Sequence, residues 1–325
     1  MYCIFDSSTD PYWNLAAEEY LLKEKKDPLF RLWRNEDSVI IGKNQNALAE
    51  IDLKFVKDNN VKVVRRLTGG GAVFHDLGNI NFTFVDSRID GEDTGMMFRR
   101  FTAPIVKALN DLGVKAYLEG RNDLLIDGRK FSGNAICIHQ NRILQHGTLL
   151  FCASINNLSG ALQARKEKFT GRAVKSNRSR VTNISEHLPQ KMDVLQFMEY
   201  LRQVVGKECP PYEYSQEDLS AIDRLCAEKY STNAWNFGTS PRYTFSKCEK
   251  FPGGLVEVHM NVEGGRIRGL EIFGDYFFRK PTDEFCALID GCEHDERKIA
   301  GRISKMALDD YFCGIAPEEL IRLFF

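Results

Sequence analysis

A glycine-rich loop with two arginines before it is the segment of the sequence best suited to bind an anion. Gly69 to Gly71 follow Arg65 and Arg66 closely and precede His75. Glycine lets a backbone approach a ligand closely, exposed N–H groups in such a loop form an anion nest, and arginine adds planar charged donors. The alternative is a tight turn with arginines facing solvent. We predict an anion site that is neither a Walker A loop nor a dinucleotide fingerprint, because GK[ST] and GxGxxG are absent.

A second candidate segment is a predicted hairpin over residues 123–138, whose strand patterns flank an Asp-Gly turn. On a strand, Lys130, Ser132 and Asn134 share one face, where the lysine can reach a bound anion. Asp123 could hold a divalent cation beside phosphates, because Mg²⁺ favours carboxylate and phosphate oxygens. The alternative is an ordinary hairpin with an exposed lysine.

The histidine and cysteine side chains, which could also take part in chemistry, give weaker evidence of a functional site. His146 lies in the middle of a predicted strand, and by itself it indicates a histidine that is hydrogen-bonded inside the core. The nine cysteines include no CxxC pair and are odd in number, which argues against a disulfide framework and a structural zinc site. We expect reduced thiols in a cytosolic protein.

The elements that position these residues mix helices and strands without a regular βαβ repeat, which predicts an α+β fold. The pattern predicts strands at 2–5, 29–34, 38–41, 61–66, 80–85, 123–126, 130–138 and 143–151, and helices at 13–25, 51–58, 96–112, 194–205 and 217–230. Strands 29–34 and 38–41 are expected to pair around the turn between them. The polar, basic residues 157–187 indicate a helix and a long surface loop.

A segment with turn residues and few aliphatic side chains, 233–243, indicates a linker between two domains. The elements predicted beyond it are strands at 254–262 and 266–273 and helices at 281–290 and 295–306. They form a small α+β domain. We therefore predict a larger domain over residues 1–240 and a small C-terminal domain over residues 241–325.

Composition limits the class of protein. The 325 residues are 43% apolar and 27% charged, with 44 basic and 45 acidic residues and a formal net charge of -1. This balance argues against a dedicated nucleic-acid binder, which usually has a basic excess. No apolar run approaches the roughly 20 residues of a membrane span, and the first residues lack the pattern of a signal peptide. We expect a cytoplasmic protein without a nucleic-acid or membrane partner.

Four motifs occur in the order found in bacterial lipoate–protein ligases of the long, two-domain type: RRLTGGGAVFHD, GRNDLLIDGRKFSGNA, QHGTLL and SNRSRVTN. DPYWNLAAEEYLL near the start and the later WNFG and FPGG are also similar to that family. The resemblance spans nearly the whole chain. It implies a catalytic domain with the biotin and lipoate ligase fold, related to class II aminoacyl-tRNA synthetases, followed by a small accessory domain.

The resemblance also implies roles for individual residues. Lys130 is the expected catalytic residue, because it would contact both the lipoyl carbonyl and the α-phosphate. The residues expected to bind ATP are Arg66, Gly71, Ala72, Val73 and Phe74, with Arg178 and Arg180 in a segment that covers the adenylate. The residues expected to bind lipoate are Arg65, Gly70, His75, Ser132, Gly133, His146 and Gly147. Asn122 and Asp123 are expected near the phosphates, with Asp123 as the candidate metal ligand. Leu67 and Thr68 stand where many members have two small residues, which could alter the shape of the pocket.

The activity implied by the resemblance is ATP-dependent lipoylation with Mg²⁺. Lipoate would be activated to lipoyl-AMP with release of pyrophosphate and then transferred to a lysine of an acceptor. Lipoyl domains of 2-oxoacid dehydrogenase complexes and glycine cleavage H protein are the implied acceptors. The nearest alternative is an ATP-independent octanoyl or lipoyl transferase of the same fold, with Cys137 or Cys152 as the thiolate. A biotin ligase and a catalytically silent lipoate-binding protein are further alternatives.

Overall fold

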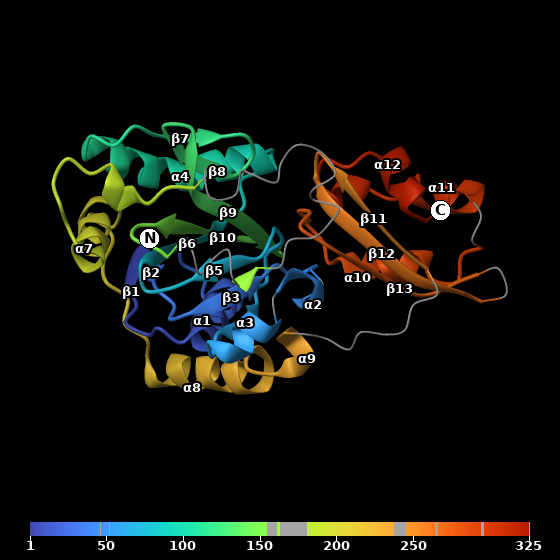
Figure 1. Ribbon diagram of the computed structural model, residues 1–325, viewed down its shortest axis with the longest axis horizontal. Coiled ribbons are helices and arrows are strands. Elements are labelled where there is room, and N and C mark those ends of the chain that lie inside the picture. The colour runs from blue at the N-terminus through green and yellow to red at the C-terminus, as the bar shows by residue number, and fades with distance from the viewer. Residues whose placement is uncertain are drawn as a thin grey trace.

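The chain forms two lobes that lie side by side (Figure 1). The structure is a computed structural model that describes residues 1–45, 47–51, 53–154, 161–162, 181–236, 245–263, 266–293 and 296–324. The larger lobe is built from the described residues up to 236, and the smaller lobe from residues 245–324. The mixture of helices and sheets in both lobes confirms the predicted α+β class. The domain boundary at residue 240 stays a prediction.

A seven-stranded sheet forms the centre of the larger lobe. Its strands, in spatial order, are β1 (Tyr2–Phe5), β2 (Leu29–Trp33), β6 (Asn79–Ser87), β10 (Arg142–Leu150), β9 (Arg129–His139), β8 (Asp123–Ile126) and β7 (Ala116–Glu119). β1 and β2 run parallel, and the other neighbours are antiparallel. The predicted hairpin of β8 and β9 is confirmed.

A second sheet of three short strands has the order β4 (Lys62–Arg65), β3 (Ser38–Ile41) and β5 (Val73–His75). The prediction that strands 29–34 and 38–41 pair is wrong. β2 pairs with β1 and β6, whereas β3 pairs with β4 and β5. Both strands are buried along their whole length, so each needs neighbours on both edges, and the short connection crosses from one sheet to the other.

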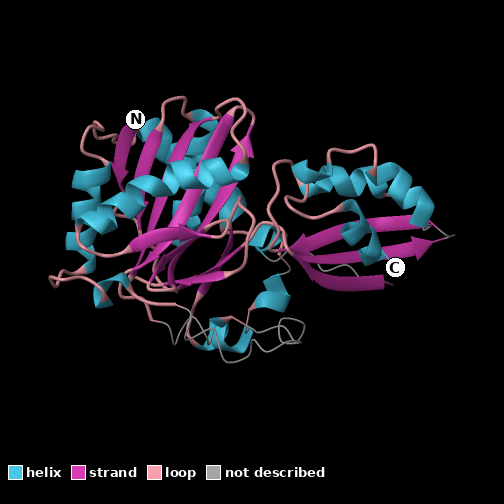
Figure 2. Cartoon of the chain, turned by 90° about the horizontal axis from the view of Figure 1, so that it is seen from above, coloured by secondary structure: helices cyan, strands magenta, loops and turns pink. Residues whose placement is uncertain are grey.

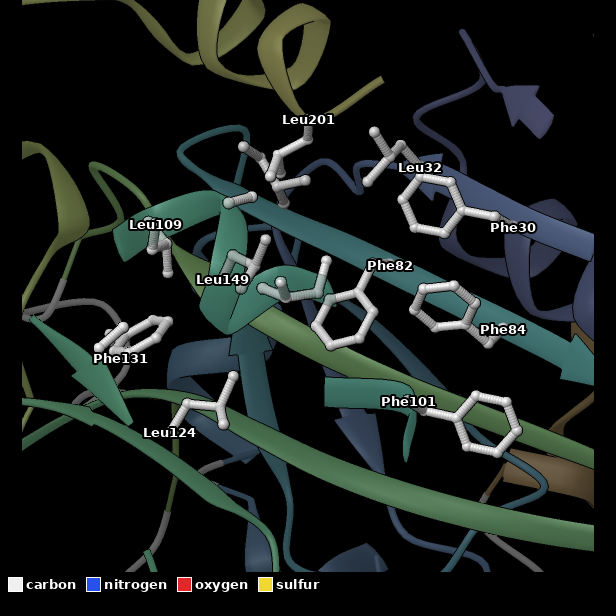
Figure 3. Packing of buried hydrophobic residues seen from close by; sticks show 14 of the residues in the cluster. Phe30, Leu32, Phe82, Phe84, Phe101, Leu109, Leu124, Phe131, Leu149 and Leu201 are labelled. Atoms are coloured by element: carbon white, nitrogen blue, oxygen red, sulfur yellow. The ribbon is translucent and has the colours of Figure 1, made fainter. Parts of the chain in front are cut away.

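One face of the seven-stranded sheet is covered by α4 (Thr94–Asp111) and α7 (Val194–Val205). Asp93 caps α4, and Asp193 forms a capping box with Gln196 at the start of α7. Figure 3 shows the resulting core, in which Phe84 of β6 stacks on Phe101 of α4 with ring centroids 5.7 Å apart. The alternation of β6 directs its phenylalanines into this core and its asparagines and threonine to the opposite face.

The opposite face carries α1 (Pro11–Glu24), which packs on α8 (Gln216–Leu225) and on the π-helical turn Cys226–Tyr230 that continues it. The N-cap of α1 is Asp10. Shorter helical segments of this lobe are α2 (Ala47–Glu50), α3 (Leu53–Asp58), η2 (Ile184–Glu186) and α9 (Asn233–Asn236). Most of the predicted basic loop at 157–187 lies outside the described residues.

The smaller lobe is a three-stranded antiparallel sheet with helices on one face (Figure 2). Its elements are β11 (Phe245–Phe251), β12 (Gly254–Glu263), β13 (Arg266–Gly274), α10 (Thr282–Ile289), α11 (Glu296–Ile303) and α12 (Pro317–Ile321). The predicted hairpin of β12 and β13 is confirmed, whereas β11 was not predicted. Among the described residues, no helix combines the length and the apolar character that a membrane span requires. All nine cysteines are free thiols.

The segment that follows β13 joins the two lobes. The buried ring of Phe277 packs edge-on against Phe98 of α4, with centroids 5.9 Å apart, and the guanidinium of Arg121 lies 3.8 Å from its centroid. Arg121 also donates to the carbonyl oxygen of Gly253 at 3.1 Å. The carbonyl of Tyr276 lies so close to the glycine-rich loop that a Cβ on Gly69 would be 2.5 Å from its oxygen. The smaller lobe is therefore docked directly on that loop.

Phe277→Ala should loosen this docking while both lobes stay folded, because the side chain fills the contact between them. Truncation of a buried phenylalanine costs about 3–5 kcal/mol. We expect calorimetry to show a smaller-lobe unfolding transition that separates from the larger-lobe transition. Phe285→Ala is the control, since Phe285 is buried inside the smaller lobe and should lower that lobe's own transition. A single, unshifted transition in Phe277→Ala would contradict the role of this contact.

Candidate active site

A cavity of about 170 Å³ lies between the seven-stranded sheet and the sheet of β3, β4 and β5. The predicted site residues that line it are Arg66, Gly70, Gly71, Ala72, Val73, His75, Asn122, Lys130, Gly133, His146 and Gly147. Residues that line it but were not predicted as site residues are Leu15, Trp33, Ile40, Asn81, Asn134, Ala135 and Thr148. Leu15, Asn134, Ala135 and Thr148 lie in the motifs quoted above but were given no role there. Trp33, Ile40 and Asn81 lie outside those motifs, and only the tertiary structure brings them to the site.

Other predicted site residues do not line the cavity. Arg65 points to the other side of its strand from Arg66 and donates to carbonyl oxygens of the backbone, among them that of Gln45 at 2.6 Å. Phe74 is buried in the core behind the small sheet. Ser132 and Asp123 are also absent from the lining. Arg178 and Arg180 lie outside the described residues.

Arg66 holds the glycine-rich loop in shape. Its buried guanidinium donates to the carbonyl oxygens of Gly69 at 2.6 Å, Gly71 at 2.8 Å and Ile40 at 3.1 Å. Burial lowers the pKa of Arg66 to about 10, although the charge of Glu18 partly compensates, so the side chain stays cationic at neutral pH. The loop is therefore folded around a fixed positive charge.

The backbone of the loop has the form of an anion nest. Gly70 adopts a φ of +92°, a left-handed conformation that favours glycine, and a Cβ there would lie 2.9 Å from Arg66 Nη2. The N–H groups of Gly69, Gly70 and Gly71 donate to no other group in the described part of the chain. The carbonyl groups of Gly69 and Gly71 bind Arg66, and the N–H groups are left for a ligand.

A β-bulge decides where Lys130 points. The pairing of β9 with β8 shifts register between Lys130 and Ser132, which leaves the buried Phe131 as the extra residue. The prediction that Lys130 shares a face with Ser132 and Asn134 is therefore wrong. Asn134 donates to Ser132 Oγ at 3.2 Å on one face, whereas the Lys130 amine lies only 3.1 Å from where a Cβ on Gly133 would be, on the cavity face.

Lys130 Nζ forms an ion pair with Asp123 Oδ1 at 2.8 Å. Its backbone is held by the chain that follows the basic loop, because Thr182 N donates to Lys130 O at 3.0 Å and Val181 forms a parallel bridge with Lys130. Within the described residues, no group of three or more His, Cys, Asp or Glu side chains could hold a metal ion. Asp123 therefore offers one carboxylate, and that carboxylate is already paired.

A hydrogen-bond chain connects α1 to the loop through His146, for which the sequence alone indicated hydrogen bonding inside the core; its partners Glu18 and Thr68 were not predicted. His146 Nδ1 lies 2.9 Å from Glu18 Oε2, and His146 Nε2 lies 2.8 Å from Thr68 Oγ1. Arg66 Nε donates to the same hydroxyl at 2.9 Å, and Thr83 donates to Glu18 Oε1 at 2.6 Å. Burial raises the pKa of Glu18, but His146 and Thr83 outweigh burial and hold it below its usual value. Glu18 is therefore a buried carboxylate that positions His146.

The arrangement can accept a molecule that is apolar along its length and anionic at one end. Leu15, Trp33 and Ile40 make one part of the cavity wall apolar. Lys130 and the nest of N–H groups provide the positive potential that a carboxylate or phosphate requires.

Two family models match the chain. Residues 10–206 match the lipoyl protein ligase A/B catalytic domain, and residues 240–324 match the bacterial lipoate protein ligase C-terminus. The chain belongs to the lipoyl protein ligase A/B family. Its membership makes it an enzyme of the lipoate–protein ligase type, and it confirms the resemblance that the motifs indicated.

Relatives of this lipoate–protein ligase family cover almost the whole chain. The chain is 39% identical to lipoate-protein ligase LplJ of Bacillus subtilis, over 97% of both chains. Its fold resembles that of P. falciparum LipL1 in complex with lipoate, with a TM-score of 0.78, 26% identity and 94% of each chain covered. It also resembles a lipoate-protein ligase A bound with ATP, with a TM-score of 0.64, 28% identity, and 73% of this chain and 98% of that chain covered.

The free energy of unfolding should decrease as the pH is lowered, because of His75. Burial, together with Arg66 and His146, lowers the pKa of His75 to about 3, against about 6.5 in an unfolded chain. Between these values the unfolded state binds a proton that the folded state does not. The free energy of unfolding should therefore fall by up to about 1.4 kcal/mol for each unit that the pH is lowered.

Urea unfolding between about pH 6.5 and pH 4.5 measures this slope, above the range where most carboxylates titrate. His75→Gln should flatten the slope, whereas His139→Gln at the end of β9 should keep it. An equal slope in the wild type and in His75→Gln would contradict the assignment.

Proposed function

We propose that this lipoate–protein ligase activates lipoate with ATP to lipoyl-AMP and then transfers the lipoyl group to a lysine of an acceptor protein. The observation that carries the proposal is that Lys130 and the glycine-rich loop line the same partly apolar cavity. The named relative is a lipoate-protein ligase, and structural relatives bind lipoate and ATP.

In the first step, the carboxylate of lipoate attacks the α-phosphorus of ATP and pyrophosphate leaves. Negative charge accumulates on the α-phosphoryl oxygens, where Lys130 and the N–H groups of Gly70 and Gly71 would stabilise it. Lys130 must exchange Asp123 for the ligand, at least in part, to make this contact. Arg66 contributes by holding the loop, because its own N–H groups are already used by carbonyl oxygens.

Mg²⁺ usually binds one or two protein carboxylates together with substrate phosphates, so Asp123 and the phosphates of ATP are the proposed ligands. Asn122 also lines the cavity. We assign Arg178 and Arg180 to a covering segment, and Val181, which directly follows, pairs with Lys130.

In the second step, the amine of an acceptor lysine attacks the mixed anhydride, AMP leaves, and the amide loses a proton. The intermediate must be shielded from water until the acceptor arrives. The proposed acceptors are lipoyl domains of 2-oxoacid dehydrogenase complexes or glycine cleavage H protein, and the proposed location is the cytoplasm.

The geometry disfavours the thiolate-dependent transferase. Neither Cys137 nor Cys152 lines the cavity. Burial raises the pKa of Cys137 to about 11 and also raises the pKa of Cys152, so both thiols stay protonated at neutral pH. A catalytic thiol usually has a lowered pKa.

Lys130→Ala should reduce lipoate-dependent exchange of pyrophosphate into ATP by about 10²–10³, because it removes a contact to developing charge. The unmutated protein should exchange with lipoate and not without it, whereas a transferase or a silent binding protein would not exchange at all. Arg129→Ala is the matched control, since Arg129 is the exposed neighbour on the same strand and should keep normal exchange. Near-normal exchange in Lys130→Ala would exclude the proposed role.

Cys137→Ser and Cys152→Ser should each keep most of the ligase activity, because the proposed chemistry has no covalent thiol intermediate. Lipoylation of an acceptor domain, followed by mass spectrometry, measures the transfer. Loss of transfer in either variant, together with a thioester-linked acyl group trapped on the unmutated enzyme, would favour the transferase instead.

A further inference from the structure

His75 places in the cavity wall a hydrogen-bond donor that has no partner among the described residues. Asn35 Nδ2 lies 3.1 Å from His75 Nδ1. An amide nitrogen donates, so Nδ1 accepts and the neutral ring carries its proton on Nε2. Nε2 is buried and has no hydrogen-bond partner among the described residues. The side chain is 3% exposed and lines the cavity.

Asn81 provides a second donor of the same kind. It lies on the cavity face of β6 and is 2% exposed. Its Oδ1 accepts from Asn79 Nδ2 at 3.1 Å, whereas its Nδ2 is buried without a partner in the described part of the chain. Buried polar groups without partners are rare in folded proteins, and two at one cavity indicate that a bound molecule supplies the acceptor.

The two donors lie away from Lys130. Asn81 pairs with Thr148 of β10, and Thr148 Oγ1 accepts from Gly133 N of β9. Lys130 lies over Gly133, so Asn81 is two strand spacings from that point, or about 10 Å. His75 lies near β2, the neighbour of β6 on the side away from β9, because its ring centroid is 6.4 Å from that of Trp33. The cavity therefore has a cationic end at Lys130 and a neutral donor end at His75 and Asn81.

The donor end fits a weak, uncharged acceptor within an apolar group. Both donors are neutral, and the neighbouring wall is formed by the side chains of Leu15, Trp33 and Ile40. A carboxylate placed at Lys130, as the proposed function requires, directs the far end of its acyl chain toward the donors. A hydrocarbon end would leave both N–H groups buried and unpaired, whereas sulfur can accept a hydrogen bond.

We infer that His75 and Asn81 form a specificity subsite for the sulfur-bearing end of the acyl chain, which makes the enzyme select lipoate over octanoate. The inference rests on the proposed function for the position of the carboxylate. In the alternative arrangement the two donors bind the carboxylate of the ligand. Removal of a donor would then lower the affinities for lipoate and octanoate equally, because both ligands carry the same carboxylate.

The test is calorimetric binding of lipoate and of octanoate to the full chain and to Asn81→Leu. The variant keeps a similar side-chain volume and removes the donor. We expect the preference of the unmutated enzyme for lipoate to fall by about 5- to 10-fold in the variant, the size of one hydrogen bond. Affinity for octanoate should stay constant or rise.

Asn79→Leu is the matched control. It breaks the same Asn79–Asn81 hydrogen bond and removes an equally buried amide from the same strand, but Asn79 does not line the cavity. It should therefore leave the preference unchanged. An equal loss of affinity for both ligands in Asn81→Leu, or equal binding of both ligands by the unmutated enzyme, would overturn the inference. Absence of lipoate-dependent pyrophosphate exchange in the unmutated enzyme would instead overturn the proposed function.

Discussion

The rest of the site depends on the buried guanidinium of Arg66. Its N–H groups turn the carbonyl oxygens of Gly69 and Gly71 inward, and this orientation leaves backbone N–H groups of the loop for a ligand. The buried carbonyl of Gly69 would lose its partner if the guanidinium were removed, at a cost of about 1–3 kcal/mol. A left-handed residue is needed where the chain reverses around the cation, and Gly70 is that residue.

A buried cation requires a compensating anion, and Glu18 supplies it from a distant part of the sequence. The carboxylate acts through His146 and the hydroxyl of Thr68, so α1, β10 and the loop are parts of one polar network. Such a network is stable only when its members are paired. The unpaired nitrogens of His75 and Asn81 stand out against it, because they belong to the same cavity and lack partners in the described structure.

Local signals in the sequence predicted the parts of the site that depend on local backbone geometry. The glycine-rich loop and the β8–β9 hairpin follow from glycines and a turn, which act over a few residues. The direction of Lys130 could not be predicted, because a bulge at Phe131 breaks the alternation that a strand pattern assumes. Glu18 could not be predicted either, since a carboxylate on a helix is usually solvent-exposed and only packing against β10 buries it.

The loop that forms the anion nest is also the surface on which the smaller lobe docks. Anion binding and docking of the smaller lobe are therefore coupled. The carbonyl of Tyr276 touches Gly69, and Asp275 Oδ2 lies 4.0 Å from where a Cβ on Gly71 would be. The Asp275 carboxylate also raises the pKa of Arg66, which burial lowers overall. An anion in the nest would face this carboxylate, so binding of an anion opposes docking in this arrangement. Because such a coupling is reciprocal, docking must weaken anion binding by the same free energy.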